Sequence, residues 1–120
     1  MQTYRAPVDD FRFILHDVLK IDNYRNLPSF EELTPDLIGA ILEEGAKFCE
    51  EQLLPLNASG DAEGCHYDDG EVRTPKGFKE AYDTYIEGSW TGLSSDPDYG
   101  GQGLPRIIAG CMGEMLMSSN

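Results

Sequence analysis

The chain has 120 residues, of which 40% are hydrophobic and 26% are charged. This length is enough for one domain and too short for two, and the composition is that of a folded chain rather than a disordered one. Nine lysines and arginines against 22 aspartates and glutamates give a formal net charge of −13. We therefore expect neither a nucleic-acid partner nor an anionic membrane surface, because both are themselves negatively charged.

Runs of strictly apolar residues are short, as in residues 107–109, so no transmembrane helix is expected. The three cysteines, Cys49, Cys65 and Cys111, are odd in number and widely spaced. We expect reduced thiols rather than a disulfide framework. Both features indicate a soluble protein of the cytoplasm or of a matrix-like compartment.

The first helix is predicted over residues 7–19. Pro7 suits its first position, where a missing N–H removes no bond. Its apolar residues recur at steps of three and four, which predicts one buried face made of Val8, Phe11, Ile14, Leu15 and Val18. Residues 22–33 follow as a connector with a short helical turn.

The clearest helix is predicted over residues 35–54. Thr34 is expected as its N-cap and Pro35 as its first residue, and Pro55 is expected to end it. Its apolar face is predicted to comprise Leu37, Ile38, Ile41, Leu42, Cys49, Leu53 and Leu54. Residues 56–73 are acidic and rich in glycine, which is typical of a loop, with one short extended pair expected around residues 71–73.

A third helix is predicted over residues 75–87, because Thr74 and Pro75 repeat the N-cap signal. Its buried stripe is predicted to be Phe78, Ala81, Tyr82, Tyr85 and Ile86. A turn follows over residues 88–93, with Trp90 packed inward.

Residues 94–104 are predicted to form a glycine loop, after which Pro105 begins a fourth helix. One side of that helix carries the apolar residues Ile107, Ile108, Cys111, Met112, Met115 and Leu116. We expect the methionines, Met117 included, to fill the core, and Tyr99 to pack as well. Strand signals are weak throughout, so the predicted fold class is all-α, a small bundle of about four main helices.

Short motifs in the chain do not amount to a catalytic or metal-binding constellation. The glycines at 100–103 lack the preceding strand and the last glycine of a dinucleotide fingerprint, so a tight loop with positive φ angles is expected instead. Cys65 and His66 lack the paired spacing of a zinc site, so no metal ligand is predicted. No nucleophile is placed by a motif near His16, which we expect to be a satisfied surface or boundary residue.

The segment WTGLSSDPDYGGQGLP, residues 90–105, resembles the W-x-x-L-x-x-P-x-x-Y-G-G-x-G-L stretch of the acyl-CoA dehydrogenase family, with Pro97 slightly displaced. Residues 4–19 and 41–90 are similar to the family in the same order, so the resemblance covers nearly the whole chain. It is similar in particular to a bacterial branch of long chains, which includes enzymes acting on methylmercaptopropionyl-CoA-like thioesters.

The resemblance implies that residues 1–120 are the N-terminal helical domain of a flavoprotein oxidoreductase of fatty acid metabolism, truncated in or just after the fourth main helix. The FAD-binding β-domain and the C-terminal helical domain, which hold the flavin and the catalytic carboxylate in the family, would be absent. No catalytic or cofactor-binding residue is therefore assigned. No FAD is expected on this segment, and the isolated chain is expected to be inactive.

In the family, the helix after the glycine loop lies near the floor of the acyl pocket. This position makes Met115 and Leu116 the predicted substrate-pocket residues. The predicted structural loop, which sets the approach of that helix to the β-domain, comprises Tyr99, Gly100, Gly101 and Gly103.

The partners that the resemblance implies are the remaining domains of the parent enzyme and its acyl-CoA substrate. The isolated chain is also expected to associate with itself through the helix over residues 105–118, because apolar surface would be left uncovered there. The alternative interpretation is a stand-alone acidic helical module that binds a basic partner or an amphipathic helix.

Overall fold

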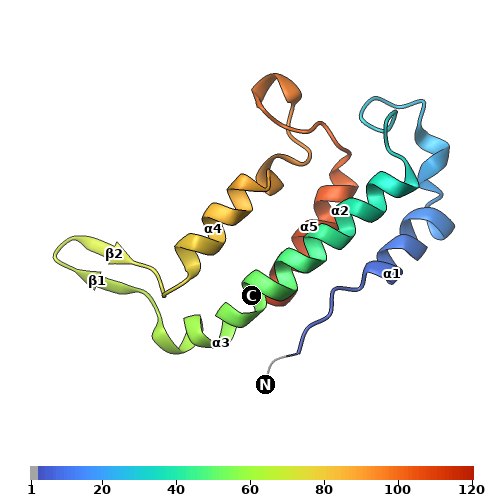
Figure 1. Cartoon of the computed structure of the whole chain (residues 1–120). Helices are drawn as coiled ribbons and strands as arrows, with labels where there is room; N and C mark the ends of the chain where they lie inside the picture. Colours follow the sequence, from blue (N-terminus) through green and yellow to red (C-terminus); the bar gives the residue numbers. More distant parts are fainter. Residues whose placement is uncertain (1–2) are drawn as a thin grey trace.

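The structure, a computed structural model, describes residues 3–120 and is mostly helical, with one β-hairpin (Figure 1). Its α-helices and strands are α1 (Val8–Arg12), α2 (Pro35–Phe48), α3 (Leu54–Glu63), β1 (His66–Asp68), β2 (Glu71–Arg73), α4 (Phe78–Glu87) and α5 (Arg106–Ser119). Short 3₁₀ turns cover Ile21–Tyr24, Trp90–Gly92 and Pro97–Tyr99. π-Helical turns over Phe13–Val18 and Cys49–Leu53 prolong α1 and join α2 to α3. Four main helical units result, which confirms the predicted all-α class.

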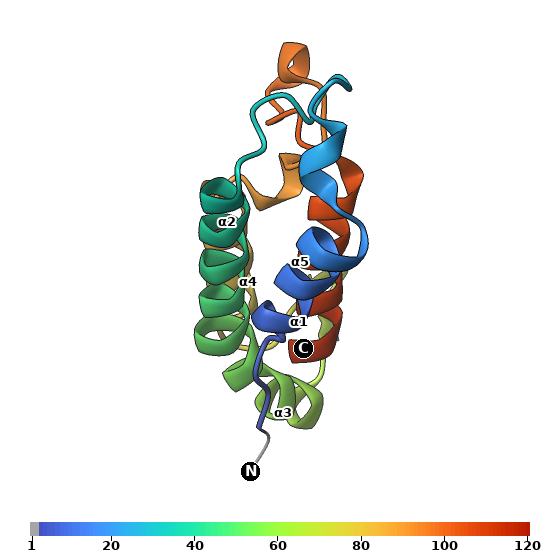
Figure 2. The same ribbon diagram turned by 90° about the vertical axis from the view of Figure 1, so that its right-hand side faces the viewer.

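The helices form a flat slab with Cα extents of 55 × 37 × 16 Å. α2 and α4 lie on one side of the slab and α1 and α5 on the other (Figure 2), and the hairpin projects beyond α4 at one end (Figure 1). α2 packs against both α1 and α5. Within residues 3–120, no helix is both long and apolar enough to cross a membrane.

The core lies where α2 packs on α5. The apolar side chains that are at most 2% exposed there are Ile38, Leu42, Cys49, Ile108, Met112 and Met115. Burying a side chain of this size stabilises the fold by roughly 1.5–3 kcal/mol. The predicted core roles of Met112 and Met115 are confirmed, whereas Met117 is 84% exposed and its prediction was wrong.

The first helix buries fewer residues than predicted. Phe11 and Leu15 are buried, but Ile14 and Val18 are 45% and 57% exposed. The reason is the π-helical turn, in which the Leu19 N–H donates to the Ile14 carbonyl oxygen, five residues back, at 2.8 Å. The wider turn changes the repeat, so Ile14 and Val18 no longer share a face with Phe11.

The second helix begins as predicted but continues past its predicted end. The Leu37 N–H donates to the Thr34 Oγ1 at 3.1 Å, which confirms the N-cap, and Pro35 is the first helical residue. Pro55 does not stop the helix. It lies in the first turn of α3, after the π-helical turn has widened the ladder, where its missing N–H removes no necessary bond.

The predicted loop is correspondingly shorter, since residues 56–63 are helical and the loop begins at Gly64. The expected extended pair is confirmed. β1 pairs antiparallel with β2, and Tyr67 lies opposite Val72. Both of these side chains are more than two-thirds exposed, so the hairpin contributes little to the core.

The third helix begins later than predicted, at Phe78 rather than at residue 75. The predicted N-cap at Thr74 is wrong, because the residue that precedes α4 is Gly77 with φ +90°, a conformation that favours glycine. The predicted buried stripe is only partly right. Ala81 is buried, whereas Tyr82 and Ile86 are 61% and 43% exposed because α4 lies at the rim of the slab.

Candidate functional site

An apolar groove opens between α3, α4 and the last turn of α5. It encloses about 380 Å³, which is within the usual size range of small-molecule sites. We refer to it as the α4 groove, and its walls are Phe48, Leu53, Leu56, Phe78, Ala81, Tyr82, Tyr85, Leu116, Met117 and Asn120. Carboxylates, histidines and thiols do not occur in this lining. The groove can therefore take up an apolar group, but it offers no acid, base or nucleophile beyond its tyrosines.

Two contacts join the walls of the α4 groove. The Asn120 side-chain amide donates to the Leu53 carbonyl oxygen at 2.8 Å, which ties the end of α5 to the helix opposite. The Phe48 and Tyr85 rings stack with centroids 5.9 Å apart, which holds α4 against α2. The groove is thus built from segments that are far apart in the sequence.

The two predicted pocket residues face different surroundings. Leu116 is half-buried and lines the α4 groove. Met115 is 1% exposed and lies in the core, where its Cε would be 2.9 Å from a Cβ placed on Gly45. A ligand in the groove could touch Leu116, whereas Met115 supports α5 from behind.

Sequence reasoning missed the part of the groove that comes from α3. Leu56 was placed in a loop because Pro55 was expected to end the helix. A signal was available in the spacing of Leu53, Leu56 and Gly60, which continues the helical repeat across the proline. Gly60 is buried against Phe78, whose ring atoms would lie 2.5 Å from a Cβ at that position.

The predicted structural loop is held together by its own main chain. The N–H groups of Gly101 and Gly103 donate to the carbonyl oxygens of Asp96 and Ser95 at 3.0 and 2.9 Å, and the Gln102 N–H donates to Gly92 at 2.8 Å. Gly100 and Gly103 have φ angles of +85° and +66°. These bonds fasten the loop to the preceding 3₁₀ turn and lead through the buried Pro105 into α5.

Steric crowding explains the glycine in the middle of this loop, and exposure separates Tyr99 from it. A Cβ on Gly101 would lie 2.1 Å from the Ser95 carbonyl oxygen, so no other residue fits. The Tyr99 side chain is 90% exposed, so the prediction that it packs within the chain was wrong.

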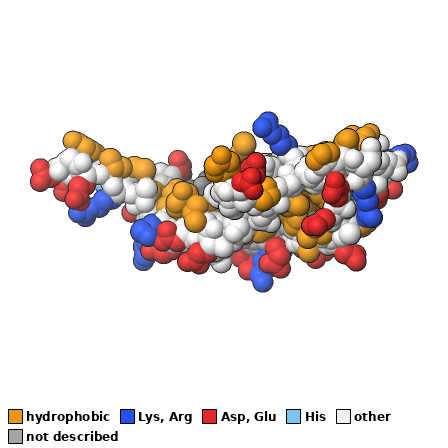
Figure 3. All heavy atoms as spheres, turned by 90° about the horizontal axis from the view of Figure 1, so that it is seen from above, with side chains coloured by type: hydrophobic (Ala, Val, Ile, Leu, Met, Phe, Trp, Pro, Cys, Tyr) orange, Lys and Arg blue, Asp and Glu red, His pale blue; other side chains and the backbone are white. Residues whose placement is uncertain are grey.

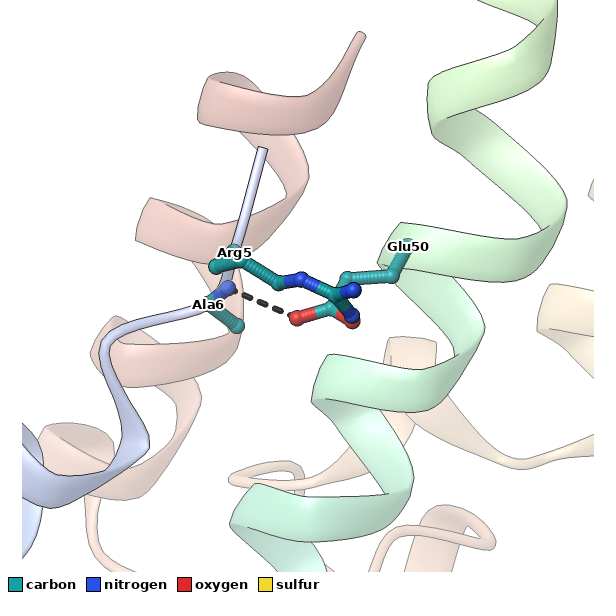
Figure 4. A network of polar contacts seen from close by, with 3 residues as sticks. All are labelled: Arg5, Ala6 and Glu50. Atoms are coloured by element: carbon teal, nitrogen blue, oxygen red, sulfur yellow. Dashed lines mark hydrogen bonds and ion pairs between the residues drawn. The ribbon is translucent and has the colours of Figure 1, made fainter. Parts of the chain in front are cut away.

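The N-terminal segment is fastened to the π-helical turn Cys49–Leu53 by one carboxylate, that of Glu50 (Figure 4). Glu50 Oε1 accepts from the Ala6 N–H at 2.8 Å, and its Oε2 accepts from Arg5 Nη1 at 2.9 Å. Tyr4 and Ala6 pack against the core next to this contact. Burial raises the pKa of Tyr4, and the neighbouring Cys49, Glu114 and Glu50 raise it further.

Burial raises the pKa values of two of the thiols. Burial raises the pKa of Cys111 to about 11, with Glu114 adding to the rise, and burial also raises the pKa of Cys49. All three cysteines carry free thiols, and Cys65 is the exposed one. Since the thiolate is the nucleophile, Cys49 and Cys111 are packing residues.

The two histidines make single contacts with carboxylates. His16 Nδ1 lies 3.4 Å from Asp22 Oδ2, and the exposed His66 lies 3.8 Å from Glu63. Over residues 3–120, no group of three or more His, Cys, Asp or Glu side chains is arranged to hold a metal ion. His16 is half-buried at the boundary, but its buried Nδ1 has no hydrogen-bond partner among the described residues, so the prediction of a satisfied boundary residue was only partly right.

The fold and the groove thus define a thin, mostly helical segment with an apolar groove on its surface, and the lining of that groove contains no carboxylate, histidine or thiol. No protein-family model matches the sequence. The chain is 35% identical over 118 residues to a 3-methylmercaptopropionyl-CoA dehydrogenase of Ruegeria pomeroyi, which covers 98% of this chain and 20% of that protein.

Two further relatives are acyl-CoA dehydrogenases as well. The broad-specificity linear acyl-CoA dehydrogenase FadE5 of Mycobacterium tuberculosis is 25% identical over 122 residues, covering 100% of this chain and 20% of that protein. The butyryl-CoA dehydrogenase of Syntrophomonas wolfei is 28% identical over 90 residues, covering 72% of this chain and 15% of that protein. The chain belongs to the acyl-CoA dehydrogenase family, and it spans about a fifth of the length of the curated relatives it matches most fully.

Proposed function

We propose that this chain is the N-terminal helical domain of an FAD-dependent acyl-CoA dehydrogenase that acts in the cytoplasm and introduces a double bond between the α and β carbons of an acyl-CoA thioester. The observation that carries the proposal is the 35% identity over 98% of the chain to a relative about five times as long. The remaining four-fifths of such an enzyme would supply the flavin site and the catalytic base, since residues 3–120 offer neither.

The domain's part in the reaction is to form one wall of the acyl pocket. The lining of the α4 groove is apolar, and Leu116 is its predicted contact with the acyl chain. Met115 acts from the core by fixing the position of α5. An apolar wall excludes water, which protects proton abstraction at the α-carbon from competing reactions.

The glycine loop does not fit a nucleotide phosphate. Its consecutive N–H groups, from Gly101 to Leu104, donate to carbonyl oxygens of the chain itself at 2.8–3.0 Å. A phosphate cradle needs main-chain donors that are free to face the ligand. We therefore assign the FAD site to the remainder of the parent enzyme and derive no step of the reaction from this segment.

The test compares the parent enzyme with the isolated chain. Each is mixed with FAD, a series of acyl-CoA thioesters and a ferricenium-type electron acceptor. We expect turnover and flavin absorbance from the parent and neither from residues 1–120. Turnover by the isolated chain, or a parent enzyme that oxidises no acyl-CoA, would overturn the proposal.

The alternative function, an acidic helical module that binds a basic partner, rests on the net charge of −13 and on the exposed apolar side chains. The coding sequence discriminates between the two. A downstream β-rich segment followed by a long helical one supports the dehydrogenase, and a natural stop codon after Asn120 supports the module. We also propose that the isolated chain associates with itself through residues 105–118.

A further inference from the structure

The β-hairpin turns two main-chain groups of β2 away from β1. Its strands are joined by a two-residue turn, residues 69–70, in which the φ angles are +47° and +82°. Such a turn is closed by main-chain hydrogen bonds between the residues that flank it, Asp68 and Glu71. Because bonded and non-bonded pairs alternate along an antiparallel ladder, the next pair, Tyr67 and Val72, is non-bonded. The N–H and C=O of Val72 therefore point outward, along what we call the β2 edge.

The β2 edge is open in this chain. Every residue of both strands is exposed, and the Val72 side chain is 69% exposed. The hairpin projects beyond α4 (Figure 1), and no main-chain group of residues 3–120 outside the hairpin bonds to Val72. An open strand edge with free donors and acceptors is a template for pairing with another strand. The side chains of β2 decide which strand fits.

The order of charges along β2 is self-complementary. Glu71 and Arg73 share one face of the strand, and Val72 lies between them on the other face. When two copies of β2 run antiparallel with Val72 opposite Val72, Glu71 of each copy lies opposite Arg73 of the other. The two Val72 residues then form a bonded pair that exchanges two main-chain hydrogen bonds. Opposite charges facing each other across strands are favourable. Both charged side chains are about three-quarters exposed, and they approach each other within the chain only to 3.7 Å.

We propose that the β2 edge is the surface on which two copies of this chain pair, with a two-fold axis through Val72. The four strands form one antiparallel sheet in the order β1, β2, β2, β1, with Tyr67 and Val72 of both copies on one face. These side chains are more than two-thirds exposed in the single chain, so pairing gives them apolar neighbours. The β2 edge is separate from residues 105–118 and from the α4 groove, and the inference does not rest on the proposed function.

Charges around the hairpin favour the β2 edge over the edge of β1. Pairing about Val72 brings the acidic turn of one copy, residues 68–69, towards Lys76 of the other, which is exposed. Pairing of two β1 strands about Tyr67 would instead bring that acidic turn towards Glu63, which carries the same charge. A second copy also supplies the matching order of charges by symmetry, whereas a different strand would have to present an acidic and a basic residue in the correct order.

The net charge of −13 does not prevent this pairing. Because the paired strands are antiparallel, the two slabs extend in opposite directions from the shared edge. At physiological ionic strength charges are screened over about 8 Å, so most of the acidic residues of the two slabs lie beyond each other's reach. The facing Glu71 and Arg73 side chains, in contrast, lie side by side.

Cross-linking of the 120-residue chain tests the two-fold axis. Val72→Cys is made with Cys65→Ser, which leaves only buried thiols besides the new one. The Cα atoms of a bonded antiparallel pair are about 5.5 Å apart, which suits a disulfide. Tyr67→Cys in the same background is the matched control, because it is as exposed but would lie about 14 Å from its counterpart. Under mild oxidation Val72→Cys should form disulfide-linked dimers roughly tenfold faster than the control.

Charge exchange in the Val72→Cys, Cys65→Ser background tests the order of charges. Glu71→Lys and Arg73→Glu each place like charges opposite each other, so each should slow cross-linking about tenfold. A 1:1 mixture of the two should cross-link at close to the original rate, because opposite charges face each other again. Both variants stay strongly acidic, so their net charges do not attract. Lys47→Glu, on the exposed side of α2, changes the net charge as much as Arg73→Glu does and should have little effect.

Val72→Cys that forms no dimer, or forms it no faster than Tyr67→Cys, would overturn the inference. A mixture that cross-links no faster than its two components would overturn it as well, because the charges would then play no part in pairing. All four substituted positions are exposed, so these variants leave the core unchanged. The measurement needs no acyl-CoA turnover, so its outcome is independent of the proposed function and of any association through residues 105–118.

Discussion

Removing the Glu50 carboxylate tests how the N-terminal segment is held. The Ala6 N–H is half-buried and donates to Glu50 at 2.8 Å, and a hydrogen bond to a charged group contributes about 1.5–3 kcal/mol. Arg5 is 89% exposed, so its ion pair with Glu50 contributes only about 0.2–1 kcal/mol. Glu50→Ala should therefore lower the free energy of unfolding by about 2–3 kcal/mol. Arg5→Ala should lower it by less than about 1 kcal/mol, and Glu50→Gln should fall between them.

Equilibrium unfolding in urea, followed by far-UV circular dichroism, measures these differences on the 120-residue chain. Labelling of Cys49, which is 0% exposed, reports the same event locally and should be faster in Glu50→Ala than in the unaltered chain. The order of the three losses in unfolding free energy decides the test. If Arg5→Ala were as destabilising as Glu50→Ala, the ion pair and not the main-chain hydrogen bond would hold the segment, and our reasoning would be refuted.

Three further predictions concern packing, pH and association. Gly60→Ala places a methyl group 2.5 Å from the Phe78 ring and should cost about 1–3 kcal/mol in urea unfolding, whereas Ala58→Gly on the exposed side of the same helix should cost no more than about 1 kcal/mol. Burial raises the pKa of Cys111 from 9.0 in the unfolded chain to about 11 in the folded chain, so the folded chain holds this proton more tightly. The free energy of unfolding should therefore fall as the pH rises from 9.0 to about 11. A free energy of unfolding that stays constant over this range would contradict the burial of the thiol. Sedimentation of the isolated chain at micromolar concentration should show more dimer at high salt than at low salt, because salt screens the −13 charge; a clean monomer at all salt concentrations would refute self-association.

The sequence was sufficient to predict the elements whose signals are local. Thr34 and Pro35 mark the start of α2 because a cap and a first-turn proline act within four residues. The buried face of α5 follows from one helical repeat that nothing interrupts. For Ile14 and Val18 the repeat itself misled, because one i→i+5 turn shifts every later residue around the helix axis.

The α4 groove was harder to predict because its walls meet only through tertiary packing. Leu116 was placed on an apolar helix face from the sequence, but its partners Phe48 and Phe78 come from two other helices. The continuation through Pro55 depends on the π-helical turn before it, and the spacing of Leu53, Leu56 and Gly60 is its sequence signal. Periodicity therefore predicts which face of a helix a residue such as Leu116 lies on, but it does not predict which other helices pack against that face.

One side of the slab is richer in apolar side chains and the other in charged ones, and this difference relates the net charge to the proposed function. At 16 Å in Cα extent the slab is thin, and its apolar α4 groove lies open at the surface, so under the proposed function other parts of the parent enzyme would complete the acyl pocket. Seen from above, charged side chains line one long edge of the slab and hydrophobic ones are more frequent along the other (Figure 3). Exposed acidic residues of the helix over Pro35–Phe48 and the turn after it, on the side opposite α5, include Glu43, Glu44 and Glu51. Acidic side chains that face solvent in this way need no basic partner to explain them.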